Sequence, residues 1–215
     1  MIIKPSKSRL IILIISIMAF LLLTISTFLG ASLLTLIDSA EQNFLDSMAP
    51  ASLSVLTKPF VLFSHGLLFG LVIFVLAFLL WGFKFKIPAA WIVLTTISGS
   101  LLINLFSLIF PHRLAGQATQ FPAHTIFFVT LLYFFLSKII VPELKSFPRQ
   151  IAGQIIILTG WILTFIGTVL STNYTFSDAV AGWLLAIAWL QLAAQFYSKY
   201  APRAYRMNGF STSWF

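Results

Sequence analysis

Apolar residues along the chain fall into six long runs that are separated by short polar stretches. A helix that crosses the hydrocarbon core of a bilayer needs about 20 mostly apolar residues, and each run is long enough. The pattern therefore predicts an all-α integral membrane protein with six transmembrane helices in a single domain over residues 1–215. The predicted helices cover approximately residues 10–37, 60–83, 88–110, 122–141, 151–171 and 179–197.

The first apolar run is too long for a cleaved signal peptide. It reads "RLIILIISIMAFLLLTISTFLGASLLTLI", whereas the apolar region of a signal peptide has roughly 7–15 residues. No A-x-A-like cleavage site ends the run, so we expect it to be a retained spanning helix.

The segment after this run, "DSAEQNFLDSMAPASLSVLTKP", has mixed polarity. It predicts either a short helix at the membrane interface, over about 40–52, or a connecting loop. Glycines inside the runs lack a side chain that would separate neighbouring helices, so they predict close helix packing. These glycines are Gly70, Gly99, Gly160, Gly167 and Gly182.

The basic residues predict an orientation. Of the 13 Lys and Arg residues, all but Lys58 and Arg113 lie before the first run, after the last, or in the second and fourth connections. With six helices these regions share one side, and the positive-inside rule makes that side, with both termini, cytoplasmic. The formal net charge of +8 is thus explained by membrane orientation, and we expect no nucleic-acid partner.

Composition supports the membrane assignment. Hydrophobic residues make up 60% of the chain and charged residues 8%, against about 25% charged residues in soluble domains. There is no cysteine, which excludes disulfides and thiolate metal sites. A short, cysteine-free chain with a basic N-terminus favours a bacterial plasma membrane.

The unusual polar residues are predicted on the extracytoplasmic side. They are His65, His112, His124 and Asp178, and ionisable residues near membrane depth are candidates for function. Simpler roles stay open, because His65 is also typical of helix packing and Ser177 or Asp178 of a helix cap. No spacing typical of metal ligands is present, so we expect neither a metal nor a cofactor.

Three stretches of the chain resemble the signature motifs of the type 2 phosphatidic acid phosphatase superfamily, the membrane lipid phosphate phosphatases related to vanadium haloperoxidases. The stretches are "SGSLLINLFSLIFPHRL", "FPAHT" and "LSTNYTFSDAVAGW". The family motifs read K-x6-R-P, P-S-G-H and S-R-x5-H-x3-D. The resemblance covers residues 39–200 and implies a helical bundle with its site in the connections between helices 3 and 4 and between helices 5 and 6.

In this family, cations of the first and third motifs bind phosphate, and the P-S-G-H histidine protonates the leaving group. The third-motif histidine is the nucleophile, and the motif's aspartate orients it. By resemblance, His124 takes the general-acid position, Asp178 the orienting position, and Arg113 the place of a phosphate-binding cation. Pro122 and Ser171 match further motif positions.

Other motif positions are not matched. The first-motif lysine falls at Ser107 or Leu108, neither of which is a cation. The glycine of P-S-G-H is missing, Thr172 replaces the third-motif arginine, and a four-residue deletion removes the nucleophilic histidine.

Three functions follow from this incomplete match. The first is a catalytically impaired family member that binds a lipid phosphate or a polyprenyl phosphate from the membrane in an outer-leaflet cleft. The second is an active lipid phosphate phosphatase in which His112 or His65 is the nucleophile and Arg113 the anion contact. The third is a membrane scaffold without enzymatic activity. Catalytic candidates are thus His124, His112 and Asp178, and substrate-binding candidates are Arg113, Ser171, Pro122 and His65.

Overall fold

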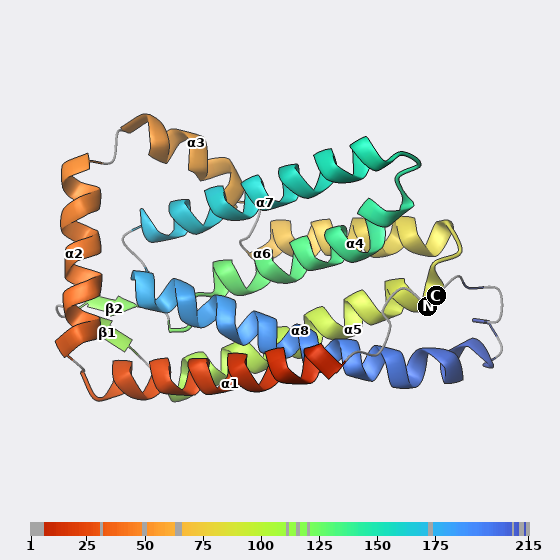
Figure 1. Cartoon of the computed structure of the whole chain (residues 1–215), viewed down its shortest axis with the longest axis horizontal. Coiled ribbons are helices and arrows are strands. Elements are labelled where there is room, and N and C mark those ends of the chain that lie inside the picture. The colour runs from red at the N-terminus through yellow and green to blue at the C-terminus, as the bar shows by residue number, and fades with distance from the viewer. Residues whose placement is uncertain are drawn as a thin grey trace.

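The computed structural model is a helical bundle with one small β-hairpin (Figure 1). It describes residues 7–30, 32–48, 51–62, 66–110, 112–114, 117–119, 121–171, 174–207, 209–210 and 213. For residues 33, 42, 45, 46, 48, 51, 52, 112–114 and 117–119, only membership of a helix or strand is described.

The elements follow one another along the chain as helices, with the hairpin before α6. They are α1 (Lys7–Phe28), α2 (Ser32–Met48), α3 (Ala51–Leu62), α4 (Gly66–Gly82), α5 (Lys86–Ile109), β1 (His112–Leu114), β2 (Gln117–Thr119), α6 (His124–Phe135), η1 (Leu136–Ile140), η2 (Val141–Glu143), α7 (Phe147–Val169) and α8 (Phe176–Tyr205). Helix α6 continues through the π turn η1 and the 3-10 turn η2.

The predicted all-α membrane fold is confirmed. Within the described residues, five helices are long and apolar enough to span a membrane: α1, α5, α6 with its η1–η2 extension, α7 and α8. Leu53–Leu62 of α3 and helix α4 are bent by 60° relative to each other, and they add a sixth span if the bent pair is counted as one. The predicted second helix, 60–83, therefore corresponds to the end of α3 and to α4, which are two helices rather than one continuous helix.

The first predicted helix, 10–37, is wrong at its C-terminal end. Helix α1 stops at Phe28, and Gly30 adopts a φ of +62°, a left-handed conformation that ends helices and that glycine adopts without a steric penalty. A separate helix, α2, begins at Ser32 and lies across one end of the bundle (Figure 1). The interfacial helix predicted over 40–52 corresponds to α2, which begins earlier along the chain.

The hairpin was not predicted either. Strands β1 and β2 pair antiparallel, with His112 opposite Thr119 and Leu114 opposite Gln117. It lies in the connection between α5 and α6, toward the end of the bundle where α2 lies (Figure 1).

Helix α8 is the centre of the bundle and packs against α1, α2, α5, α6 and α7. Aromatic side chains fill the space between these helices. Phe20 of α1 stacks on Phe121, with ring centroids 6.3 Å apart, and Trp91 of α5 meets Tyr197 of α8 at 5.0 Å.

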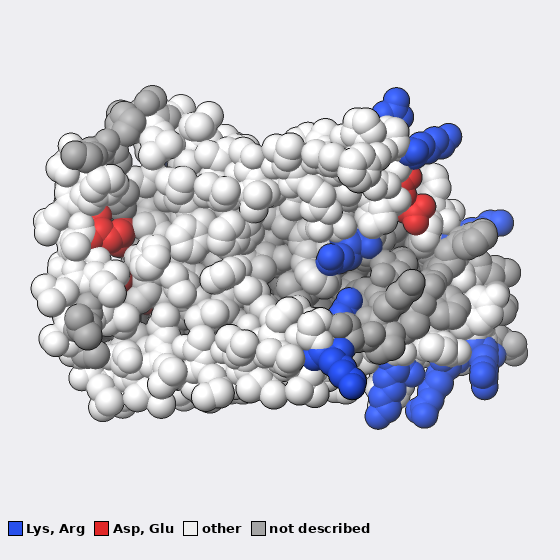
Figure 2. Space-filling model, in the orientation of Figure 1, with Lys and Arg blue, Asp and Glu red and all other residues white. Residues whose placement is uncertain are grey.

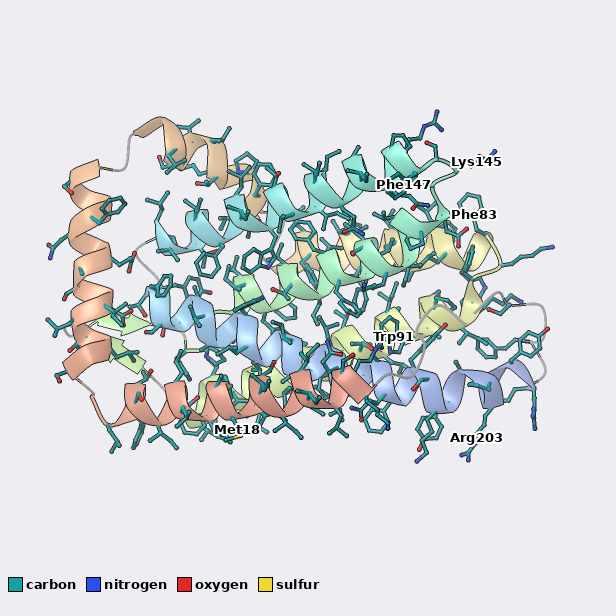
Figure 3. All side chains as sticks on the ribbon, in the orientation of Figure 1. Met18, Phe83, Trp91, Lys145, Phe147 and Arg203 are labelled. Atoms are coloured by element: carbon teal, nitrogen blue, oxygen red, sulfur yellow. The ribbon has the colours of Figure 1, made fainter. Side chains whose placement is uncertain are left out.

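The outer surface of the bundle is apolar, as a lipid-facing surface must be. Met18 on α1 and Phe147 at the start of α7 project outward with 59% and 73% of their surface exposed, whereas Trp91 lies inside (Figure 3).

Charge divides the molecule into two ends. Lys and Arg side chains gather at the end where α1 begins and α8 finishes, here called the basic end. Carboxylates are seen at this end and also at the opposite end, beside α2, here called the α2 end, where the picture shows no Lys or Arg (Figure 2). The distribution has the form that the positive-inside rule describes, so the prediction that the basic end is cytoplasmic stands as a prediction.

Candidate functional site

The segments that carry the second and third candidate motifs meet at the α2 end. The backbone N–H of Ala123, just before α6, donates to the carbonyl of Asp178 in the first turn of α8, with 3.0 Å between N and O. Gly182, one turn further along α8, makes this approach possible, because a Cβ there would overlap the Ala123 carbonyl. The residues around His124 and Asp178 are thereby held side by side.

His124 is the first residue of α6 and is half-buried. Its Nε2 atom is enclosed by protein and has no hydrogen-bond partner among the described residues. A buried polar atom without a partner is costly and calls for an explanation, such as a ligand that supplies the missing bond. The structure thus leaves the predicted general acid with an unused hydrogen-bonding atom.

Asp178 is fully buried and closes a capping box at the start of α8. Its Oδ2 accepts from the backbone N–H of Thr175 at 3.0 Å, and its own N–H donates to Thr175 Oγ1 at 3.2 Å. Asp178 thus takes part in the cap of this helix, although the N-cap residue is Thr175 and not Ser177 or Asp178. The carboxylate thus has a local structural role whether or not it has a catalytic one.

A third residue at this site, Asp38, belongs to α2. Its Oδ1 accepts from the backbone N–H of Ser177 at 3.1 Å and its Oδ2 from the Ser177 hydroxyl at 2.8 Å, and the side chain is 1% exposed. A helix N-terminus attracts anions through its free N–H groups and its dipole. In this structure a carboxylate from the protein itself occupies that position on α8.

Asp38 lies outside the three motif-like stretches and is a site residue that the sequence motifs do not reveal. The available signal was its spacing from Glu41, since residues three apart lie on the same face of a helix. That face of α2 packs on the start of α8, where Asp38 contacts Ser177.

Glu41 lies one turn along α2 and is half-buried, and neither carboxylate oxygen has a hydrogen-bond partner among the described side chains and backbone. Burial raises the pKa of Glu41 from 4.5 to about 7; the nearby Phe176 backbone opposes this rise and the Asp38 carboxylate adds to it. The acidic pair therefore does not carry two full negative charges at neutral pH.

The raised pKa of Glu41 predicts a pH-dependent stability. The folded protein keeps this proton up to about pH 7, whereas the unfolded chain releases it near pH 4.5. Stability should therefore fall as pH rises between these values and level off above them. Because Glu41 is partly exposed, we expect Glu41→Gln to gain only about 1 kcal/mol, or roughly 2–4 °C in melting temperature, at about pH 8.

Thermal unfolding of the purified protein in detergent, measured at about pH 5 and about pH 8, checks this expectation. Glu143→Gln, at the exposed Glu143 of η2, is the matched control and should leave the pH dependence unchanged. If the melting temperatures of Glu41→Gln and of the unmodified protein change by the same amount between the two pH values, the expectation is wrong.

The other residues that were predicted to bind substrate or to act in catalysis are described to different extents. Pro122 is buried after a cis bond from Phe121. The Ser171 hydroxyl donates to the Thr168 carbonyl at 2.5 Å, at the end of α7. His112 and Arg113 are in β1, but their side chains are not described, and His65 lies outside the described residues.

Tyr174 is a further buried residue of this region and lies within the third stretch that resembles a family motif. It packs with Ala123, Ile126 and Ala179, and burial raises the pKa of its phenol. Its position joins the third candidate motif to the start of α6. As for metals, no group of three or more His, Asp or Glu side chains within the described part of the chain is placed to hold an ion.

Comparisons with known proteins give one informative match. No protein-family model matches the chain, and no curated protein shows significant sequence similarity to it. Among solved structures, the chain is similar to the first transmembrane PAP2-type phosphatidylglycerolphosphate phosphatase from Bacillus subtilis, with a TM-score of 0.70. The match covers 87% of this chain and 96% of that one at 13% sequence identity. The chain is therefore an integral membrane protein with the fold of the PAP2-type phosphatases.

Proposed function

We propose that this protein is a catalytically impaired relative of the PAP2-type phosphatases, with its former site at the α2 end. The observation that carries the proposal is the position of Asp38 at the start of α8. The resemblance places the phosphate-binding and nucleophilic residues of the third motif just before that start. A carboxylate there repels a phosphate by like charge and takes up N–H and O–H donors that would otherwise be available to it.

The missing nucleophile supports the same proposal. The chain between Ser171 and Asp178 contains no histidine, and Thr172 stands where the family has arginine. A covalent phosphoenzyme needs a nucleophile placed close to phosphorus. His124 at the general-acid position cannot supply both the acid and the nucleophile in one step.

A ligand-binding role remains compatible with the residues that are present. Arg113 supplies a cation, and His124 carries a ring nitrogen without a partner in the described structure. A guanidinium and an imidazole are suitable donors for the oxygens of a lipid phosphate or polyprenyl phosphate. We therefore include recognition of such a headgroup, without hydrolysis, in the proposed function.

A second candidate is a membrane scaffold with no phosphate ligand. It is favoured by the same Asp38 contact, since two hydrogen bonds from one side chain fix α2 to α8 and cover the helix N-terminus. In that case the α2 end is a structural joint.

Phosphate release by the purified protein tests hydrolysis. Short-chain phosphatidic acid, phosphatidylglycerolphosphate and a polyprenyl diphosphate are the substrates, and an active PAP2-type phosphatase is assayed beside it. We expect a rate lower by a factor of about a thousand or more, because catalytic groups act as a unit and losing one removes most of the effect.

Turnover that disappears in His112→Ala or His124→Ala would contradict the proposal and indicate a rearranged active site. If turnover is absent, saturable binding of a non-hydrolysable phosphatidic acid analogue that Arg113→Ala weakens supports headgroup recognition. If neither turnover nor binding is detected, the result favours the second candidate function, a membrane scaffold.

A further inference from the structure

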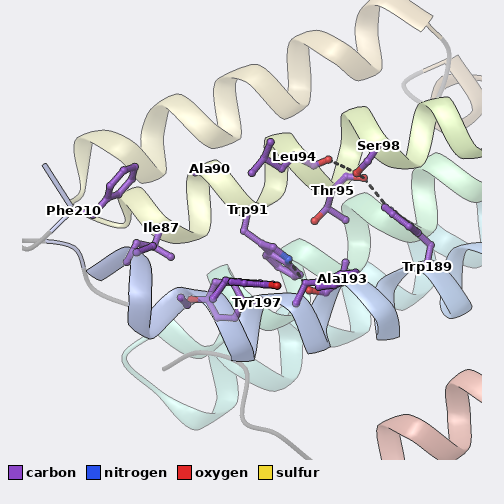
Figure 4. Close-up of a pocket in the computed structure, with 14 residues that line it drawn as sticks. Ile87, Ala90, Trp91, Leu94, Thr95, Ser98, Trp189, Ala193, Tyr197 and Phe210 are labelled. Carbon is purple, nitrogen blue, oxygen red and sulfur yellow. Dashed lines mark hydrogen bonds between the residues drawn. The ribbon is translucent and has the colours of Figure 1, made fainter. Parts of the chain in front are cut away.

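A second feature of the protein lies away from the α2 end, between α5 and α8. Here the two helices enclose a cavity of about 560 Å³ that is open on one side (Figure 4). On α5 its lining runs from Ile87 to Ser98, a separation of eleven positions or roughly 16 Å at 1.5 Å per residue. That is about half of the ~30 Å hydrocarbon core, so the cavity spans the depth of one leaflet.

Two tryptophans hold the walls of this cavity apart at a fixed distance. The Trp91 indole on α5 donates to the Ala193 carbonyl on α8 at 3.1 Å. The Trp189 indole on α8 donates in the opposite direction, to the Thr95 carbonyl on α5, at 3.0 Å. Figure 4 shows both bonds crossing between the helices. Because each indole is attached to one helix and hydrogen-bonded to the other, the two helices that line the cavity are fixed relative to each other.

The walls of the cavity are apolar, and among the described residues that line them one polar atom is buried without a hydrogen-bond partner. Tyr197 lines the cavity and is 4% exposed, and its hydroxyl has no hydrogen-bond partner among the described residues. Small residues, including Ala90 and Ala193, leave the space open. Such a surface fits a hydrocarbon chain.

Two cationic residues of α8, Lys199 and Arg203, contact a residue that lines the cavity. Tyr200 lines the cavity, and its ring lies 5.5 Å from the Lys199 ammonium nitrogen and 5.7 Å from the central carbon of the Arg203 guanidinium. Both cationic residues are exposed, and Arg203 projects outward from α8 (Figure 3). Cation–π contacts with Tyr200 thus place two positive charges next to a residue that lines the cavity.

We propose that the α5–α8 cavity binds an anionic phospholipid. An acyl chain occupies the apolar space, and Lys199 and Arg203 bind the headgroup phosphate. A basic pocket between spanning helices is a recurring site for anionic lipids. The charge pair favours a lipid over a second apolar helix, which has no anion to offer. The site is separate from the α2 end and does not depend on phosphatase activity there.

Native mass spectrometry of the full chain in detergent tests the site, with phosphatidylglycerol as the probe and phosphatidylcholine as the neutral comparison. We expect saturable binding of phosphatidylglycerol in preference to phosphatidylcholine. A Lys199→Gln/Arg203→Gln variant should bind phosphatidylglycerol at least tenfold more weakly, since each cation near a membrane surface contributes about a fivefold effect. Both side chains are exposed, so the variant should fold.

The matched control is Lys145→Gln/Arg149→Gln, which removes two exposed charges from the basic end at the start of α7. It should bind phosphatidylglycerol like the unmodified protein, and an equal loss in both variants would show attraction to the whole basic end and overturn the site. Ala90→Phe fills the cavity and should also weaken binding. If Ala90→Phe instead leaves lipid binding intact and changes the oligomeric mass, the cavity holds a helix of a second copy and the proposal is wrong.

Discussion

Replacing Asp38 with alanine should lower the melting temperature of the protein by about 5–10 °C. The change removes the two hydrogen bonds that the carboxylate accepts from Ser177, one from its backbone N–H and one from its hydroxyl. These donors are buried, and leaving buried donors without a partner costs about 2–3 kcal/mol. In a chain of this size each kcal/mol corresponds to roughly 2–4 °C. Thermal unfolding in detergent, followed by tryptophan fluorescence, measures the effect.

Two further variants make the Asp38 result specific. Ser39→Ala changes the exposed neighbour, whose hydroxyl donates to Leu36 within the same helix, and should leave the melting temperature almost unchanged. Asp38→Asn keeps an acceptor oxygen but loses the charge that favours a helix N-terminus, so an intermediate decrease is expected. Equal melting temperatures for Asp38→Ala and Ser39→Ala would show that the α2–α8 contact is not stabilising.

The spanning segments could be predicted because the bilayer imposes a simple requirement. Backbone polar groups in hydrocarbon must be paired within the segment, and side chains facing lipid must be apolar. Runs of apolar residues therefore indicate helices directly. The predicted helices 88–110, 151–171 and 179–197 correspond to α5, α7 and α8, although α7 and α8 begin several residues earlier than predicted and α8 extends further.

Changes of direction within apolar sequence could not be predicted in the same way. Apolar residues continue on both sides of Gly30, so hydropathy gives no sign that α1 ends and α2 turns across the bundle. The break between α3 and α4 is hidden for the same reason. In both places backbone conformation, rather than polarity, determines the structure.

The candidate site was predictable as far as local motifs reach. The segments around His124 and Asp178 were assigned from short matches, and the Ala123–Asp178 hydrogen bond joins them. The contribution of Asp38 could not be predicted, because it is 139 residues from Ser177 along the chain and depends on where α2 lies. Long-range contacts of this kind follow from tertiary packing and leave no local pattern.

The predicted role of glycines in close packing is confirmed at most positions and wrong at one. A Cβ added at Gly99, Gly160 or Gly167 would lie 2.9, 2.5 or 2.7 Å from a neighbouring side-chain atom. At Gly70 it would meet nothing within 4 Å. Gly182 differs from the other tight positions, because its neighbour is the backbone of Ala123, which cannot rotate away as a side chain can.

Gly182→Ala should therefore be strongly destabilising. The added methyl group would force α8 away from the segment that begins α6 and weaken the Ala123–Asp178 hydrogen bond. Overpacking costs about 1–3 kcal/mol and more where the backbone must move, while the better helix propensity of alanine returns at most about 1 kcal/mol. We expect a net loss of roughly 2–3 kcal/mol, or about 5–10 °C in melting temperature.

Gly70→Ala is the matched control, since it makes the same change inside helix α4 where the space is open. It should leave the melting temperature unchanged or raise it slightly, because helix propensity is then the main difference. A stable Gly182→Ala protein would mean that α8 and the start of α6 are not in contact. The adjacency of His124 and Asp178, on which both the impaired-phosphatase proposal and the rearranged alternative depend, would then be lost.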